Sequence, residues 1–258
     1  MLGLCVGSFL NVLIWRTLHN MSPYTGRSIC DHCGRQLAWF ENIPLLSFVV
    51  LRGKCRTCSK KIDWSYPLVE GVTGVLFLWW ATLGVAFFRL SQAPLTYFQP
   101  LFWLLVGLML VVIFFSDVLY MIIPDYALVV LGVATLAYRG VLVHLGVMRV
   151  EDFYLSLASG AVGFLVFLAL FLGTRGRGMG FGDVKFAFIM GFLVGFPRVL
   201  IAMFVGFLTG GIYGGGLLLM GKKKFGSKVA FGPFLVVGLV TSLLWGEVLW
   251  SWYWGLIS

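Results

Sequence analysis

Long apolar segments constrain this chain more than any other feature of its sequence. Five of them approach the roughly 20 residues that an α-helix needs to cross a bilayer. They cover residues 67–88, 98–116, 153–173, 199–220 and 229–257. Only 11% of the 258 residues are charged, against about 25% in a soluble domain. The sequence therefore predicts an all-α, polytopic membrane protein.

Three further segments bring the predicted number of transmembrane helices to about eight. Residues 126–148 are long enough to cross a bilayer but are interrupted by Arg139 and His144. Residues 1–15 and 184–196 are apolar but short. The first of these lacks the basic region of a secretory signal peptide, which predicts a retained helix or one whose N-terminal end is missing. The spans divide the chain into a first transmembrane helix (1–16), a polar loop domain (17–65) and a helical membrane core (66–258).

The placement of Lys and Arg residues predicts the orientation of these helices. If the polar loop is cytoplasmic, eight spans put fifteen of the nineteen Lys and Arg residues on the inside. This bias agrees with the positive-inside rule. The lysine-rich segment 221–228 then acts as a cytoplasmic topology signal that also meets anionic lipid. The net charge of +9 is thereby explained without a nucleic-acid partner.

Two CxxC pairs in the polar loop predict a metal site. Cys30 and Cys33 are followed, after 21 intervening residues, by Cys55 and Cys58. This spacing is typical of a structural zinc site with four thiolate ligands. Two disulfides or four unrelated thiols are the alternatives, and a reducing cytoplasm disfavours the disulfides. Cys5 lies in an apolar run, where a packing role is expected.

Carboxylates in or beside apolar segments are functional candidates because their burial in a membrane is costly. Asp117 is expected near the C-terminal end of a span, where the helix dipole disfavours an anion. Asp183 follows Gly178, Gly180 and Gly182 at the start of a short apolar segment. A helix N-cap is the simpler alternative for Asp183, whereas it is a poor explanation for Asp117.

The predicted topology brings Asp117 and Asp183 to the same membrane face, although they are 66 residues apart. Two carboxylates in such a place can activate a water as a base and donate a proton to a peptide carbonyl. Asp125 follows Pro124 and is expected to be an ordinary first-turn acid. Lys185 is expected either to orient Asp183 or to meet lipid headgroups.

Five motifs, in order, resemble those of the type 4 prepilin peptidases, which are aspartic proteases of the bacterial inner membrane. They are GSFLNVLIWR (7–16), the double CxxC loop, YPLVE (66–70), D-x6-PD (117–125) and the GxGD signature in GMGFGDVK (178–185). The resemblance extends from residue 3 to about residue 235. Two departures are a shorter first helix and Phe186, which stands where the family often has leucine.

The resemblance implies that Asp117 and Asp183 are the catalytic pair. Supporting residues are expected at Gly180, Gly182, Lys185, Asp125 and Glu70. Family members cut the short basic leader from prepilins and pseudopilins of type IV pili and type II secretion, at the cytoplasmic face and after a glycine. Many then methylate the new N-terminus with S-adenosylmethionine, and the Cys loop favours this second activity. Glu70 is expected either to serve methyl transfer or to have a structural role at a helix end.

Other functions are compatible with parts of the sequence. A peptidase without methyltransferase activity would share the same aspartates. An ion-coupled transporter would use the membrane acids as ion ligands, but it would not explain the GxGD and PD motifs or the zinc loop. A membrane scaffold organised by the zinc loop would leave the acids unexplained.

Overall fold

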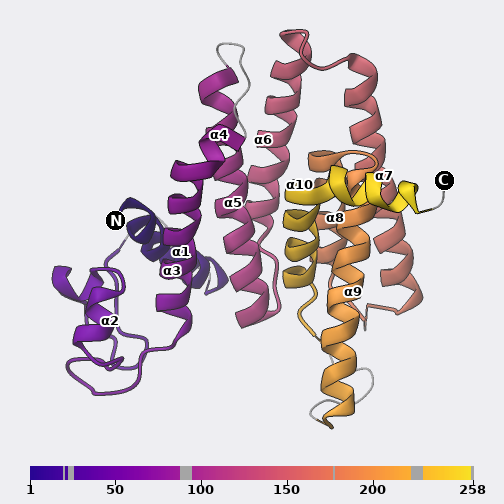
Figure 1. Cartoon of the computed structure of the whole chain (residues 1–258). Coiled ribbons are helices and arrows are strands. Elements are labelled where there is room, and N and C mark those ends of the chain that lie inside the picture. The colour runs from indigo at the N-terminus through magenta and orange to yellow at the C-terminus, as the bar shows by residue number, and fades with distance from the viewer. Residues whose placement is uncertain (20, 23–25, 88–94, 177, 222–228, 257–258) are drawn as a thin grey trace. The chain divides into compact units, whose positions relative to one another are not determined.

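The computed structural model describes residues 1–19, 21–22, 26–87, 95–176, 178–221 and 229–256 (Figure 1). Segment 222–228, which holds most of the predicted topology signal, lies outside the described residues, as do Arg89 and Arg177. The helical elements are α1 (Leu2–Leu18), η1 (Trp39–Asn42), α2 (Leu46–Val50), α3 (Ser65–Trp79), η2 (Trp80–Gly84), α4 (Val85–Phe87), α5 (Leu95–Tyr120), α6 (Asp125–His144), α7 (Val150–Gly173), α8 (Phe181–Val194), α9 (Arg198–Leu219) and α10 (Gly232–Gly255). The described part of the chain contains two isolated β-bridges but no β-strand, and the predicted all-α class is confirmed.

Among the described residues, six helical stretches are long and apolar enough to cross a membrane. They are Ser65–Phe87, in which α3 continues through the π-helical turn η2 into α4, and the helices α5, α6, α7, α9 and α10. A multi-pass membrane protein is thereby confirmed. The apolar helix α1 has only 17 residues, and α8 has 14, about 21 Å of helix against a hydrocarbon core of about 30 Å. The count of eight spans stays a prediction.

The chain forms two compact units, Met1–Phe115 and Ser116–Ser258. The N-terminal unit holds α1 to α4, the polar loop and most of α5, and α1 packs along α3 within it. The C-terminal unit holds the last residues of α5 and the helices α6 to α10. The cysteine pairs belong to the first unit, while Asp117 and Asp183 belong to the second.

Helix α8 lies at the centre of the C-terminal unit. It contacts α6, α7, α9 and α10, and it is apolar on all sides, with Val184, Phe186, Ala187 and Met190 fully buried. A helix that is apolar all round belongs inside a bundle. The start of this central helix carries Asp183.

Glycines allow α7 and α8 to approach backbone to backbone. A Cβ atom added at Gly160 of α7 would lie 2.7 Å from the carbonyl oxygen of Phe188. One added at Gly191 of α8 would lie 2.5 Å from the carbonyl oxygen of Ser159. Lipid is as apolar as the side chains, so membrane helices associate through close packing of this kind. The glycines therefore determine how α8 sits against α7.

We expect Gly191→Ala to destabilise the protein by about 1–3 kcal/mol, the usual cost of overpacking a well-packed interior. Denaturant or thermal unfolding in detergent would measure the change. The matched control is Gly211→Ala on α9, where an added Cβ meets nothing within 4 Å. The control should be neutral or slightly stabilising, because alanine favours a helix over glycine by about 1 kcal/mol. Equal stability of the two variants would contradict the packing argument.

Candidate active site and metal centre

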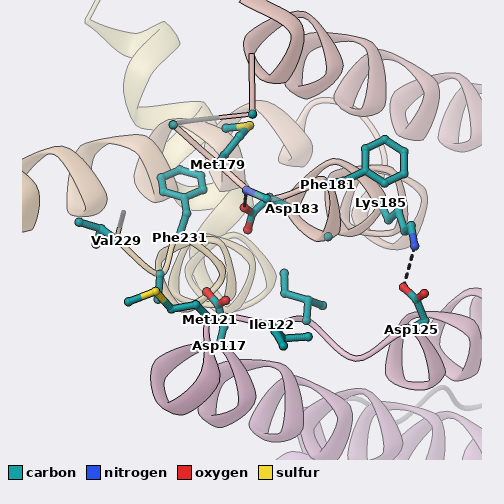
Figure 2. A pocket seen from close by; sticks show the side chains of 16 residues that line it. Asp117, Met121, Ile122, Asp125, Met179, Phe181, Asp183, Lys185, Val229 and Phe231 are labelled. Atoms are coloured by element: carbon teal, nitrogen blue, oxygen red, sulfur yellow. Dashed lines mark hydrogen bonds and ion pairs between the residues drawn. The ribbon is translucent and has the colours of Figure 1, made fainter. Parts of the chain in front are cut away.

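Asp117 and Asp183 line a single cavity in the C-terminal unit. Its volume is about 290 Å³, and its walls come from the end of α5, the glycine-rich segment before α8 and the segment before α10. Each aspartate is only 5% exposed. Figure 2 shows the two carboxyl groups on opposite sides of the cavity, both directed into it. The structure thus brings together the two acids that the sequence singles out.

Asp117 is held by the start of another helix. Its Oδ2 atom accepts a hydrogen bond of 2.8 Å from the N–H group of Gly232, the first residue of α10. Any Cβ at position 232 would lie 2.8 Å from the same oxygen, so the approach requires glycine. Asp117 lies in the last turn of α5, where its own helix dipole is unfavourable, and the N-terminus of α10 compensates. Asp117 therefore caps α10 rather than its own helix.

Asp183 is the third residue of α8 and reaches back to the residue before the helix. Its Oδ2 atom accepts a hydrogen bond of 3.0 Å from the N–H group of Gly180. The N-cap position itself belongs to Gly180, so Asp183 is not the N-cap that the sequence offered as an alternative. Within the described part of the chain, nothing donates a hydrogen bond to its buried Oδ1 atom. A buried acceptor without a partner is costly, and this oxygen marks a place for water or substrate.

Four of the five supporting residues, Gly180, Gly182, Lys185 and Asp125, line the same cavity. A Cβ at Gly182 would lie 3.1 Å from the Cβ of Ile123, so glycine lets α8 pack against the segment that follows α5. Lys185 pairs with Asp125 through an Nζ–Oδ1 contact of 2.7 Å. Figure 2 shows this ion pair at the edge of the cavity, apart from Asp117 and Asp183. Lys185 thus joins α8 to the first turn of α6 and does not contact Asp183.

Gly232 is a site residue that the sequence reasoning missed. The available signal is the Phe-Gly-Pro sequence at 231–233, since proline in the first turn marks the start of a helix. Phe231 also lines the cavity. The pattern indicates where α10 begins, but nothing in it indicates that the Gly232 N–H group meets a carboxylate 115 residues earlier.

The four cysteines of the polar loop converge in the N-terminal unit. Their Sγ atoms all lie within 4.8 Å of one another, and those of Cys30 and Cys58 are 3.9 Å apart. A tetrahedral zinc ion with Zn–S bonds of about 2.3 Å places its sulfurs about 3.8 Å apart. The cluster therefore fits a four-thiolate zinc site.

Two similar hairpins carry these cysteines. In the first, the Cys30 N–H group donates to the carbonyl of Arg35, and in the second the Cys55 N–H group donates to the carbonyl of Lys60, both at 2.9 Å. Each hairpin also has a residue with positive φ directly after its second cysteine, Gly34 (φ 68°) or Ser59 (φ 55°). The two CxxC pairs thus occupy the same kind of turn.

Glu41 is a further residue that the sequence reasoning missed. It is 7% exposed and accepts hydrogen bonds from Arg35, at 2.6 Å, and from the N–H group of Ala38, at 2.7 Å. These donors, with Arg35 the larger cause, lower the pKa of the Glu41 carboxyl. Glu41 therefore ties η1 to the first cysteine hairpin.

Glu70 lies on α3 and is 9% exposed. It accepts a hydrogen bond of 2.8 Å from the N–H group of Leu45, the N-cap residue of α2, which has a φ of 59°. The contact ties the start of α2 to α3 and fits the structural alternative for Glu70. A role for Glu70 in methyl transfer stays a prediction.

Comparison with known proteins identifies relatives along almost the whole chain. The family described as the bacterial peptidase A24 N-terminal domain matches residues 1–83, and the type IV leader peptidase family matches residues 103–215. A Bacillus subtilis (strain 168) protein named prepilin leader peptidase/N-methyltransferase is 31% identical over 252 residues, which cover 97% of this chain and 94% of that protein. A protein of the same name from Aeromonas hydrophila is 32% identical over 282 residues, with 97% and 91% covered. No solved structure matches.

The cysteine geometry predicts about one zinc ion per purified chain. We expect Cys30→Ser to lose most of this zinc and to lower the stability of the loop, because three thiolates no longer complete the tetrahedron. Cys5→Ser is the matched control, since Cys5 lies exposed on α1 rather than in the packed interior that the sequence indicated. Metal analysis by mass spectrometry measures both variants. Full zinc content in a Cys30→Ser, Cys55→Ser double variant would contradict the assignment.

Proposed function

Because this chain belongs to the type IV leader peptidase family, we propose that it removes the leader peptide of prepilins or pseudopilins and then methylates the new N-terminus. The relatives that it matches over almost their full length carry both activities in their names. A peptidase without methyltransferase activity and an ion-coupled transporter are not favoured by this relationship.

We assign the hydrolysis to Asp117 and Asp183. The observation that carries this assignment is that two buried carboxylates face one cavity, each with one oxygen fixed by a backbone N–H group. The fixed oxygens hold the carboxyl groups in place. The remaining oxygens, among them the unpartnered Oδ1 of Asp183, are free to meet a water and a peptide carbonyl.

In the proposed reaction, the two aspartates begin with one proton between them. The ionised carboxylate takes a proton from water as the water oxygen bonds to the carbonyl carbon, and the protonated carboxyl gives its proton to the carbonyl oxygen. One hydroxyl of the resulting diol then returns a proton to the second carboxyl. The first carboxyl protonates the leaving amine as the C–N bond breaks. The pair ends with one proton, as it began.

We place the cleavage at the cytoplasmic face of the bacterial inner membrane, after a glycine of the leader. The bias of Lys and Arg residues supports this orientation. It puts the end of α5 and the start of α8 on the inside, together with the Cys loop. Prepilin or pseudopilin and the surrounding lipid are the proposed partners.

We propose that residues 17–65 form a zinc-stabilised loop domain between the first helix (1–16) and the membrane core (66–258). The fit of four sulfurs to a tetrahedron supports a structural ion at Cys30, Cys33, Cys55 and Cys58. Zinc bound there would connect the two hairpins and leave no open position for substrate. The methyl donor in the second activity is S-adenosylmethionine, whose methyl group passes to the new N-terminal amine.

The aspartate pair is tested by amide substitutions. Asp117→Asn and Asp183→Asn should each lower the rate of prepilin cleavage by roughly 10⁴-fold, the scale seen when one member of a catalytic unit is removed. The double variant should be no slower than either single variant, because groups that act as one unit are not additive. Cleavage is followed by mass spectrometry of the product, and zinc content reports that the variants remain folded.

Asp125→Asn is the matched control for this experiment. The ion pair of Asp125 with Lys185 is exposed, and such pairs contribute about 0–1 kcal/mol, so cleavage should fall less than about tenfold. Normal cleavage by a folded Asp183→Asn protein would reduce Asp183 to a helix-terminal residue.

The two activities are separated by supplying a pilin that has already been cleaved, together with S-adenosylmethionine. The Asp117→Asn and Asp183→Asn variants should methylate it at the rate of the unchanged protein, because methyl transfer needs no activated water. The product should gain the mass of one methyl substituent only when S-adenosylmethionine is present. Cleavage without this gain by the unchanged protein would support the peptidase-only alternative.

A further inference from the structure

The short helix α2 carries an apolar face that nothing in the described polar loop covers. Leu46, Val49 and Val50 occupy positions i, i+3 and i+4, which share one side of a helix. Their exposed fractions are 56%, 69% and 69%. The opposite side is packed, since Phe48 of α2 contacts Trp64 with ring centroids 4.9 Å apart and the rings tilted by 59°. An apolar face of this kind on a polar loop marks an interaction site.

Two contacts fix the level of α2 along α3. One is the ring contact of Phe48 with Trp64, the residue before α3, and the other is a hydrogen bond. The N–H group of Leu45 donates to Glu70, which lies five residues after the first residue of α3. Five residues correspond to about 7.5 Å of helix axis. Ser65–Phe87 is one of the stretches that can cross a membrane, so α2 begins beside a point inside this span. Figure 1 shows α2 beside the start of α3.

A second exposed apolar stripe lies on α3, the helix against which α2 packs. Leu68, Val72 and Val75 on α3 are exposed and follow one another at intervals of four and three residues, on one side of the helix. Trp64 stands one turn before Leu68 and is 70% exposed. Trp64 therefore extends this stripe to the level of α2, whose Phe48 contacts it.

The charges next to α2 complement an anionic surface. The segment 52–61 contains Arg52, Lys54, Arg56, Lys60 and Lys61 and no acidic residue, and all five cations are exposed. The acids of the loop are engaged elsewhere: Glu41 with Arg35, Asp31 with Tyr66, and Asp63 with the N–H group of Ser65. An apolar helix face beside a group of cations is the pattern of helices that lie in the bilayer interface.

From these observations we infer that α2 docks on the bilayer interface, with Leu46, Val49 and Val50 at the acyl boundary and the neighbouring cations at anionic headgroups. The occupant of the apolar face is lipid. The zinc hairpins are thereby held against the membrane surface rather than suspended in solvent. This inference does not rest on the proposed catalytic roles.

The experiment uses the full chain with the photoreactive residue p-benzoylphenylalanine in place of Val49. The protein is reconstituted in vesicles of phosphatidylethanolamine and phosphatidylglycerol, and adducts are identified by mass spectrometry after irradiation. We expect lipid adducts at position 49 to exceed severalfold those of the matched control at Gln36, an exposed residue of the first cysteine hairpin that lies outside the basic segment 52–61. Zinc content shows that both variants keep the loop folded.

Three outcomes would overturn the inference. Equal lipid yields at positions 49 and 36 would exclude a specific docking face. Adducts of position 49 with a second copy of the chain, with added prepilin or with another part of the same chain would assign the face to protein. Equal yields in vesicles of phosphatidylcholine alone would exclude the contribution of anionic headgroups, which we expect to raise the yield severalfold.

Discussion

A carboxylate buried in a membrane protein needs hydrogen-bond donors, and backbone N–H groups supply them at both aspartates. Peptide donors differ from Lys or Arg because they carry no formal charge. A cation beside the pair would favour two ionised carboxylates, whereas peptide donors leave the pair able to hold a single proton. Among the described residues that line the cavity the one cation is Lys185, and it is directed to Asp125 instead. The requirement for peptide donors explains why α10 begins with glycine at Asp117 and why extended backbone at Gly180 precedes α8.

The cavity lies at the start of the short helix α8. A 14-residue helix covers about two thirds of the hydrocarbon thickness, and the glycine-rich segment before it continues the chain without helical hydrogen bonds. Irregular backbone at membrane depth is tolerated only where it is buried in protein or lines a cavity. Helix α6 holds α8 at both ends, through Asp125 with Lys185 at 2.7 Å and through Arg139, which donates to the carbonyl of Leu193 at 3.1 Å. These two contacts fix the axial position of α8, and with it the depth of Asp183.

Hydropathy was sufficient to predict the membrane class and the approximate position of most helices. It placed the short central segment at 184–196, close to α8. Counting spans predicted that Asp117 and Asp183 share one membrane face, which allows them to meet, whereas the cavity that they both line is seen only in the structure. The contacts of Gly232, Glu41 and Glu70 could not be predicted. Hydropathy gives the location of a helix but neither its rotation nor its neighbours. Almost every residue has a backbone N–H group, so the sequence does not show which of them donates to a carboxylate.

The cysteine loop shows the same limit on a smaller scale. Its two hairpins share backbone hydrogen bonds and a residue of positive φ, yet CDHCGR and CRTCSK have in common only their cysteines and a basic residue, Arg35 or Lys60, two positions after the second cysteine. The two hairpins therefore share a backbone conformation that their side chains barely indicate. Closing the two hairpins on one metal ion would also close the 21 residues between them into a loop, which removes much of their conformational freedom. That loop contains α2, and Glu70 ties its start to α3. With the proposed ion bound, metal, loop and membrane helix would form one continuous support. Ordering the thiolates would then also order the surface that we infer to face the bilayer.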